Sequence, residues 1–118
     1  MSSDRLRRVE EAIREVIADA LAGDIKDPRV GFVTVTDVRT SPDLRHAHVH
    51  VSVLGDETQR EDSMQGLRSA HGFLQRQIGA QLRLKRTPEL EFHYDVTTDN
   101  AMRIESLLRE DADESRRG

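Results

Sequence analysis

The chain has 118 residues and a formal net charge of −4, and it contains neither cysteine nor tryptophan. This length fits one domain with a modest core, and the lack of cysteine excludes disulfides, a thiol nucleophile and cysteine-ligated zinc. No apolar run approaches the roughly 20 residues that span a bilayer. The stretch Met1-Ser2-Ser3-Asp4 leads straight into charged residues and lacks the apolar region of a signal peptide, so we expect a cytoplasmic protein with no membrane contact.

The first half of the chain predicts a helix followed by a β-hairpin. Residues 4–22 place apolar side chains at three- and four-residue spacing, which is typical of an amphipathic helix. Asp27-Pro28 breaks that pattern, and β-branched residues over 31–40 favour a strand. After the turn signal Ser41-Pro42-Asp43, residues 46–53 alternate between apolar and polar, which is the period of a half-buried strand.

Residues 57–83 predict two helices with a bend between them. Apolar residues recur there at helical spacing, and either Asp56 or Thr58 could form a capping box at the start. Because glycine inside a helix pattern often marks a kink or a close backbone approach, we expect the two helices to join at Ala70-His71-Gly72.

The remaining segments complete a two-layer α+β domain. Thr87-Pro88 ends the helix pattern, residues 89–96 predict a third strand, and residues 99–109 predict a short helix. We therefore expect the order α-β-β-α-α-β, with helices covering one face of a three-stranded sheet, as a single domain over residues 1–109. Residues 110–118 are polar and predict a disordered tail.

One segment is unusually basic for this acidic chain. The window from Ser63 to Pro88 holds no carboxylate and carries +5, which leaves −9 for the rest of the −4 chain. Its five cations are Arg68, Arg76, Arg83, Lys85 and Arg86. Phosphate binding depends on such a local patch and not on the overall balance, although many charge runs are only solvated helix faces. Five phosphate contacts would give a salt slope of roughly −3.5.

The few aromatic residues argue against base stacking as the main mode of binding. The chain has three Phe and one Tyr. We expect Phe32, Phe73 and Phe92 to lie in the core, which leaves Tyr94 as the one aromatic candidate for a wet face. Backbone contacts and shape should therefore matter more than stacking on exposed rings.

His46, His48 and His50 project from one face of the predicted second strand. Imidazoles in such an array could bind zinc, but a carboxylate would have to come from Asp43 or from a neighbouring strand. We interpret the three histidines as the solvent-facing side of the strand and predict no metal. No catalytic motif, glycine-rich phosphate loop or paired carboxylate points to an enzyme, and no cofactor is expected.

Several stretches together resemble a known family, ribosome-binding factor A of bacteria. The resemblance covers about residues 5–110, in the same order and with near-identical gaps. The stretches that carry it include Asp27-Pro28-Arg29-Val30-Gly31, Ser41-Pro42-Asp43-Leu44, Ala70-His71-Gly72-Phe73-Leu74 and Arg83-Leu84-Lys85-Arg86-Thr87-Pro88.

The resemblance implies a fold, a function and a partner. It implies a type II K-homology-like domain and a non-catalytic assembly factor that binds the free small (30S) ribosomal subunit late in maturation. It further implies contact with 16S rRNA, support for processing of the RNA's 5′ end, and growth in the cold. The chain has no Gly-x-x-Gly, with which ordinary K-homology domains clamp a single strand, so we expect folded RNA to be recognised.

The predicted RNA contacts come mainly from the basic window. We also expect the protein to be a monomer. The window's five cations are the main phosphate contacts, with Ala70 and Gly72 predicted to set the shape of the kink. Further candidates are His71, Arg29, Arg45, Arg5 and Arg8. Two alternatives stay open: a module that docks ribosomal proteins or an assembly GTPase, and a small metal-dependent ribonuclease.

Overall fold

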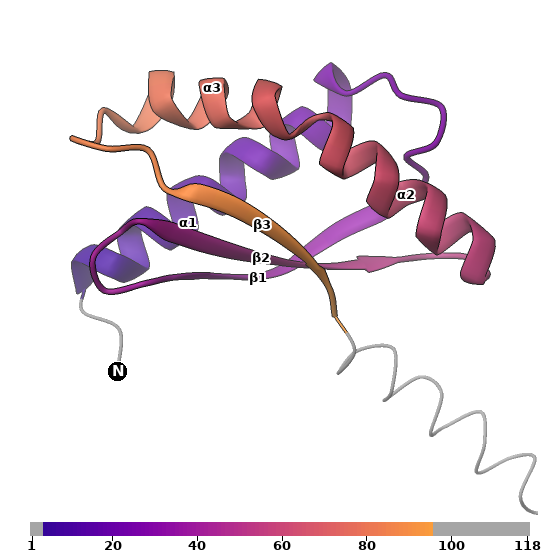
Figure 1. The fold of residues 1–118 in the computed structure, drawn as a ribbon, viewed down its shortest axis with the longest axis horizontal. Helices are drawn as coiled ribbons and strands as arrows, with labels where there is room; N and C mark the ends of the chain where they lie inside the picture. Colours follow the sequence, from indigo (N-terminus) through magenta and orange to yellow (C-terminus); the bar gives the residue numbers. More distant parts are fainter. Residues whose placement is uncertain (1–3, 96–118) are drawn as a thin grey trace, which may run out of the picture.

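The computed structural model describes residues 4–95, whose elements follow the predicted order (Figure 1). The elements are α1 (Asp4–Asp19), β1 (Val33–Thr40), β2 (His46–Val53), α2 (Glu57–Ser69), α3 (His71–Leu82) and β3 (Glu89–Tyr94). The predicted helix over 99–109 and the predicted tail over 110–118 lie outside the described residues.

The three strands form one sheet in the order β1-β2-β3. β1 and β2 pair antiparallel as the predicted hairpin, with a bulge between Val35 and Asp37. β3 pairs parallel with β2, because α2 and α3 carry the chain back before it re-enters the sheet. All three helices pack on one side of the sheet, which confirms the two-layer arrangement (Figure 1).

The core lies between the sheet and the helices. Alternate residues of β2 supply its sheet side, and Val49 and Val51 are fully buried. The apolar stripes of the helices supply the other side, through fully buried residues such as Ile13, Leu67 and Ile78. The opposite face of the sheet has no helix over it within residues 4–95, and we call it the open face.

The first helix ends differently from the prediction. α1 stops at Asp19 and continues as a π turn, η1 (Ala20–Asp24), where the Ile25 N–H donates to the Ala20 carbonyl oxygen at 2.9 Å. This wider turn carries the helical segment past the predicted end at residue 22.

The first strand begins at Val33 and not at residue 31 as predicted. Gly31 donates its N–H to the Ser63 side chain of α2 at 3.1 Å and so lies off the strand ladder. The prediction that Phe32 is a core residue is wrong, because Phe32 is 80% exposed. Val33 packs against the core, and successive side chains point to opposite sides of an extended chain, so Phe32 points outward.

Tyr94 does not lie on the solvent-exposed face of the sheet. It points to the same face of β3 as the buried residues Leu90 and Phe92 and packs against the core. The Arg60 guanidinium of α2 lies over its ring, 4.6 Å from the ring centre.

The two capping alternatives for α2 are decided in favour of Asp56. Its side chain accepts from the Gln59 N–H at 2.8 Å, and the Gln59 side chain accepts from the Asp56 N–H at 2.8 Å. This reciprocal pair satisfies two backbone donors and defines the start of α2.

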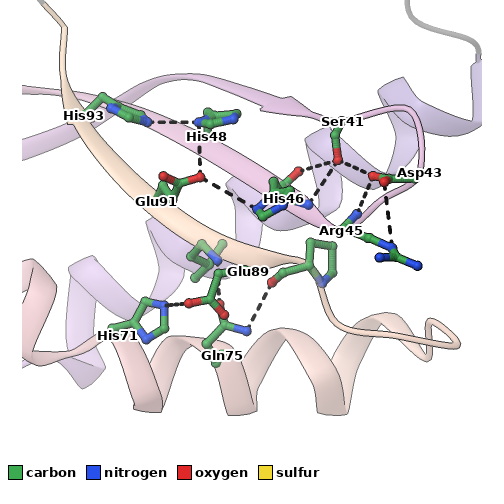
Figure 2. A network of polar contacts seen from close by, with 12 residues as sticks. Ser41, Asp43, Arg45, His46, His48, His71, Gln75, Glu89, Glu91 and His93 are labelled. Carbon is green, nitrogen blue, oxygen red and sulfur yellow. Dashed lines mark hydrogen bonds and ion pairs between the residues drawn. The ribbon is translucent and has the colours of Figure 1, made fainter.

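A side chain of α3 closes the outer edge of β3. Gln75 donates to the Pro88 carbonyl oxygen at 3.1 Å and accepts from the Leu90 N–H at 2.7 Å. The amide thus makes the two hydrogen bonds that a further strand would make, and it locks α3 to the sheet (Figure 2).

Candidate nucleic-acid interface

The two central helices join at the predicted bend. Ala70 leaves the helical conformation, with φ −84° and ψ 1°, and α3 starts at His71. The Ala70 side chain packs against the core, which fixes the bend from inside. Within residues 4–95 no side chain caps the start of α3, so its first-turn N–H groups are available for a ligand near the exposed Gly72.

The sequence predicts that Gly72 sets the shape of the bend, but the described residues pack loosely around Gly72. A Cβ atom there would meet only the tip of the Arg76 side chain, at 3.4 Å. The close packing occurs instead at Gly66 of α2, where a Cβ would lie 2.5 Å from Cγ2 of Val30. The sequence carried a signal for this, a glycine inside an apolar helical pattern, but not the identity of its neighbour.

Four cations from three separate segments line one groove of about 620 Å³. Lys85 and Arg86 come from the segment after α3, Arg45 from the turn between β1 and β2, and Arg5 from the start of α1. Asp43 is the one carboxylate among the described residues that line this groove. We call this set the basic groove, and its excess of positive charge suits a phosphate backbone.

A rigid turn holds Arg45 in the basic groove. The Ser41 hydroxyl donates to the Asp43 carboxylate at 2.6 Å, and the carboxylate accepts from the Arg45 N–H at 3.0 Å (Figure 2). These bonds, the hydroxyl's first, lower the pKa of Asp43, so the carboxylate stays ionised and holds the turn. The Arg45 carbonyl oxygen accepts from the Glu89 N–H at 2.8 Å, which ties this turn to the start of β3.

The end of α3 places the other two cations. Arg83 adopts a left-handed conformation, with φ 50° and ψ 39°, and so ends the helix. Leu84 then packs against the core, while Lys85 and Arg86 remain exposed on the far side of that anchor. Leu84 therefore anchors this basic stretch at the groove, which it also lines.

The remaining predicted contacts lie elsewhere. Arg68 and His71 line a separate hollow of about 290 Å³ beside β3, which also includes Glu91 and His93. The His71 Nε2 lies 3.3 Å from a Glu89 carboxylate oxygen, so this hollow is less positive than the basic groove. The basic window therefore does not form one patch: Lys85 and Arg86 line the basic groove, Arg68 lines this hollow, and Arg76 and Arg83 line neither.

Arg29 is engaged within the protein. Its guanidinium pairs with the Asp27 carboxylate at 2.6 Å and also donates to the Ser69 hydroxyl at 2.9 Å. It thereby ties the segment before β1 to the end of α2. By contrast, the five cations of the basic window make no ion pair with any residue in the range 4–95.

Known proteins share this fold. A family model described as ribosome-binding factor A matches residues 5–108. The chain belongs to this family. The resemblance read from the sequence is thereby confirmed, and the family's name describes binding and not a reaction.

Solved structures of the family agree with the fold. A solution NMR structure of a candidate ribosome binding factor A from Thermotoga maritima is 35% identical with a TM-score of 0.70, over 79% of this chain and 89% of that chain. The crystal structure of ribosome-binding factor A from Thermus thermophilus is 27% identical with a TM-score of 0.67, over 75% of this chain and 93% of that chain.

A third structure of the family concerns a complex. It is a homology model of the Thermus thermophilus factor fitted into a cryo-EM map of a 30S complex, at 28% identity and a TM-score of 0.61, over 73% of this chain and 90% of that chain. Together these likenesses confirm the expected type II K-homology-like α+β fold. No helix within residues 4–95 has the length and apolar character needed to cross a bilayer.

Proposed function

We propose that this protein binds the free small ribosomal subunit through 16S rRNA late in subunit maturation. In that role it supports processing of the RNA's 5′ end and growth in the cold, acting as a monomer. The family match and the relative fitted into a 30S complex support this proposal.

The basic groove is the observation that carries the proposal. It gathers four cations around one carboxylate in a protein whose net charge is −4. Its lining residues come from the start of α1, a β-turn and the segment after α3, so the fold has to assemble it. A rigid, preformed set of cations suits the backbone of a folded RNA, whose shape is read through phosphate contacts.

The bend between α2 and α3 supplies a second point of contact. Arg68 and Arg76 flank it along the two helices, and His71 and Gly72 form the first turn of α3. Because Gly72 is exposed and nearly free of neighbours, an RNA backbone could approach the N–H groups there closely. Ala70 packs against the core at the bend, and Gly66 allows α2 to pack closely against Val30.

Sedimentation with ribosomal particles tests the proposal. Wild-type protein should migrate with free small subunits, and not with large subunits or full ribosomes. Replacing Arg45, Lys85 and Arg86 by Gln removes three groove cations and should weaken small-subunit binding by roughly tenfold or more near physiological salt.

A matched control removes the same charge from another surface. Arg7, Arg14 and Arg39 line a hollow that also contains Glu10, Glu11 and Asp37. Replacing those three arginines by Gln should leave binding within about twofold of wild type. Equal losses in both triple variants would contradict a role for the groove. Unchanged binding in the groove variant would favour the alternative of a protein-docking module.

A further inference from the structure

Two histidines meet on the open face of the sheet. Nδ1 of His48 on β2 lies 3.0 Å from Nε2 of His93 on β3 (Figure 2). A carboxylate oxygen of Glu91 lies 3.7 Å from the same His48 nitrogen. One donor atom from each of these three side chains lies within 4.8 Å of the other two.

The strand pairing places these donors together without any loop. His48 stands opposite Glu91, and His50 stands opposite His93, in the parallel register of β2 and β3. Glu91 and His93 are two residues apart on one strand, so their side chains leave the sheet on the same face. The site therefore spans two paired strands, with His48 on the central strand and Glu91 and His93 on the neighbouring edge strand.

The donor set has the chemistry and the spacing of a zinc site. Two imidazole nitrogens and one carboxylate oxygen form a known protein ligand set for Zn²⁺, with a fourth position left for water or another side chain. Metal–ligand bonds of about 2.0–2.1 Å in a tetrahedron separate the donors by roughly 3.3 Å. The observed 3.0 and 3.7 Å lie on either side of that value, and no separation in the cluster exceeds 4.8 Å, so rotations of the side chains can bring the three donors to this spacing.

We propose that His48, Glu91 and His93 form a zinc-binding site that bridges β2 and β3. Each imidazole must offer a lone pair from the nitrogen that faces the other ring. In the metal-free neutral pair, one ring holds the proton that lies between the two nitrogens. On metal binding that proton passes to solvent and the same ring takes up a proton at its outer nitrogen, so both imidazoles stay neutral, with protons on Nε2 of His48 and Nδ1 of His93. His46, whose Nδ1 lies 3.8 Å from the Glu91 carboxylate, is placed to supply the fourth ligand.

The charges around the site act on a bound cation in both directions. On β1, the neighbouring Arg39 is paired with Asp37 at 2.8 Å, which offsets its charge. On α2, Arg68 is the unpaired cation near His93 within the described residues, and its positive charge opposes metal binding.

Titration of the untagged full chain with ZnCl₂, after removal of metal by a chelator, tests the site. Calorimetry should give one zinc per chain. A free zinc concentration 100-fold above Kd should raise Tm by roughly 10 °C. The ¹⁵N resonances of His48 Nδ1 and His93 Nε2 should shift together as zinc is added.

Variants decide whether these three residues are the ligands. His48→Gln and Glu91→Gln should each weaken zinc binding by at least roughly 100-fold. The control is Glu61→Gln, which removes an exposed carboxylate of α2 outside the cluster and should keep wild-type affinity. Circular dichroism verifies that each variant is folded.

Two outcomes would overturn the site: no stoichiometric zinc binding at millimolar ZnCl₂, or equal affinity in wild type and His48→Gln. Because the titration contains no RNA, its failure leaves the proposed function untouched. Loss of ribosome binding likewise says nothing about zinc.

Discussion

The guanidinium of Arg29 donates to both oxygens of the Asp27 carboxylate, at 3.0 Å from Nε and at 2.6 Å from Nη2. The Asp27 oxygen also accepts from the Arg29 backbone N–H at 2.9 Å. These hydrogen bonds, the side-chain ones first, lower the pKa of Asp27 from 3.8 to about 2. A basic residue that looked available for RNA therefore serves to order the segment that leads into β1.

This pair predicts a pH dependence of stability. The folded pKa of Asp27, about 2, lies below the unfolded value of 3.8. The pair therefore stabilises the fold fully above pH 3.8 and loses its contribution as the pH falls toward 2. Urea unfolding between about pH 5 and pH 2 should show a shallower loss of stability in Asp27→Asn than in wild type. In an Arg29→Gln background, Asp27→Asn should change the pH profile little; an equal change in both backgrounds would contradict the pairing.

At the scale of elements, the unusual contact is the one between α3 and the edge of β3. An edge strand exposes unpaired N–H and C=O groups, which invite pairing with another chain. The Gln75 amide fills both positions on β3, one as a donor and one as an acceptor. It also holds α3 in register with the strand that follows the basic segment. One side chain thus protects the sheet and positions the loop that carries Lys85 and Arg86.

Replacing Gln75 by Ala should lower the free energy of unfolding by about 1–3 kcal/mol, because two hydrogen bonds are lost. Gln81→Ala provides the matched control on the same helix. Gln81 is exposed and donates only to the Gln77 side chain, at 3.2 Å. Its replacement should cost well under about 1 kcal/mol. Urea titration of both variants measures the difference, and equal costs would show that the edge contact contributes nothing.

At the scale of the whole molecule, the surface separates its charges. The chain carries −4 overall, yet the basic groove combines four cations with one carboxylate. A different hollow, between α1 and β1, combines Arg7, Arg14 and Arg39 with three acidic residues. Binding to a polyanion should therefore depend on which surface loses a cation, and not only on the net charge.

The salt dependence of RNA binding should report this separation. Each phosphate contact contributes about −0.7 to the slope of log K against log salt. The double variant Lys85→Gln/Arg86→Gln should therefore make the slope less steep by roughly 1.4. The control is Arg7→Gln. In the wild type the Arg7 guanidinium pairs with Asp4 at 3.3 Å, so its removal should leave the slope unchanged. Binding assays with free small subunits between about 50 and 200 mM salt measure both slopes. A double variant with the wild-type slope would exclude these two cations from contact with phosphate.

The sequence by itself determined the local elements. Apolar periodicity located three helices and three strands, and the alternation in His46–Val53 identified both its core face and its histidine face. The bend at Ala70 also followed from the sequence. These features are local, because they depend on spacing, turn chemistry and the size of near neighbours. Phe32 shows the limit of such reasoning, since its hydrophobicity predicted burial and the alternation at the start of β1 points it outward.

Tertiary structure decided which distant residues become neighbours. No spacing in the chain indicates that Arg5, Arg45 and Lys85 share a groove, or that Gly66 packs against Val30. The parallel pairing of β3 with β2 brought Glu91 and His93 beside His48, and thus supplied the carboxylate that the histidine array lacked on its own strand. Contacts of this kind depend on the register and packing of whole elements, which the local pattern of side chains does not specify.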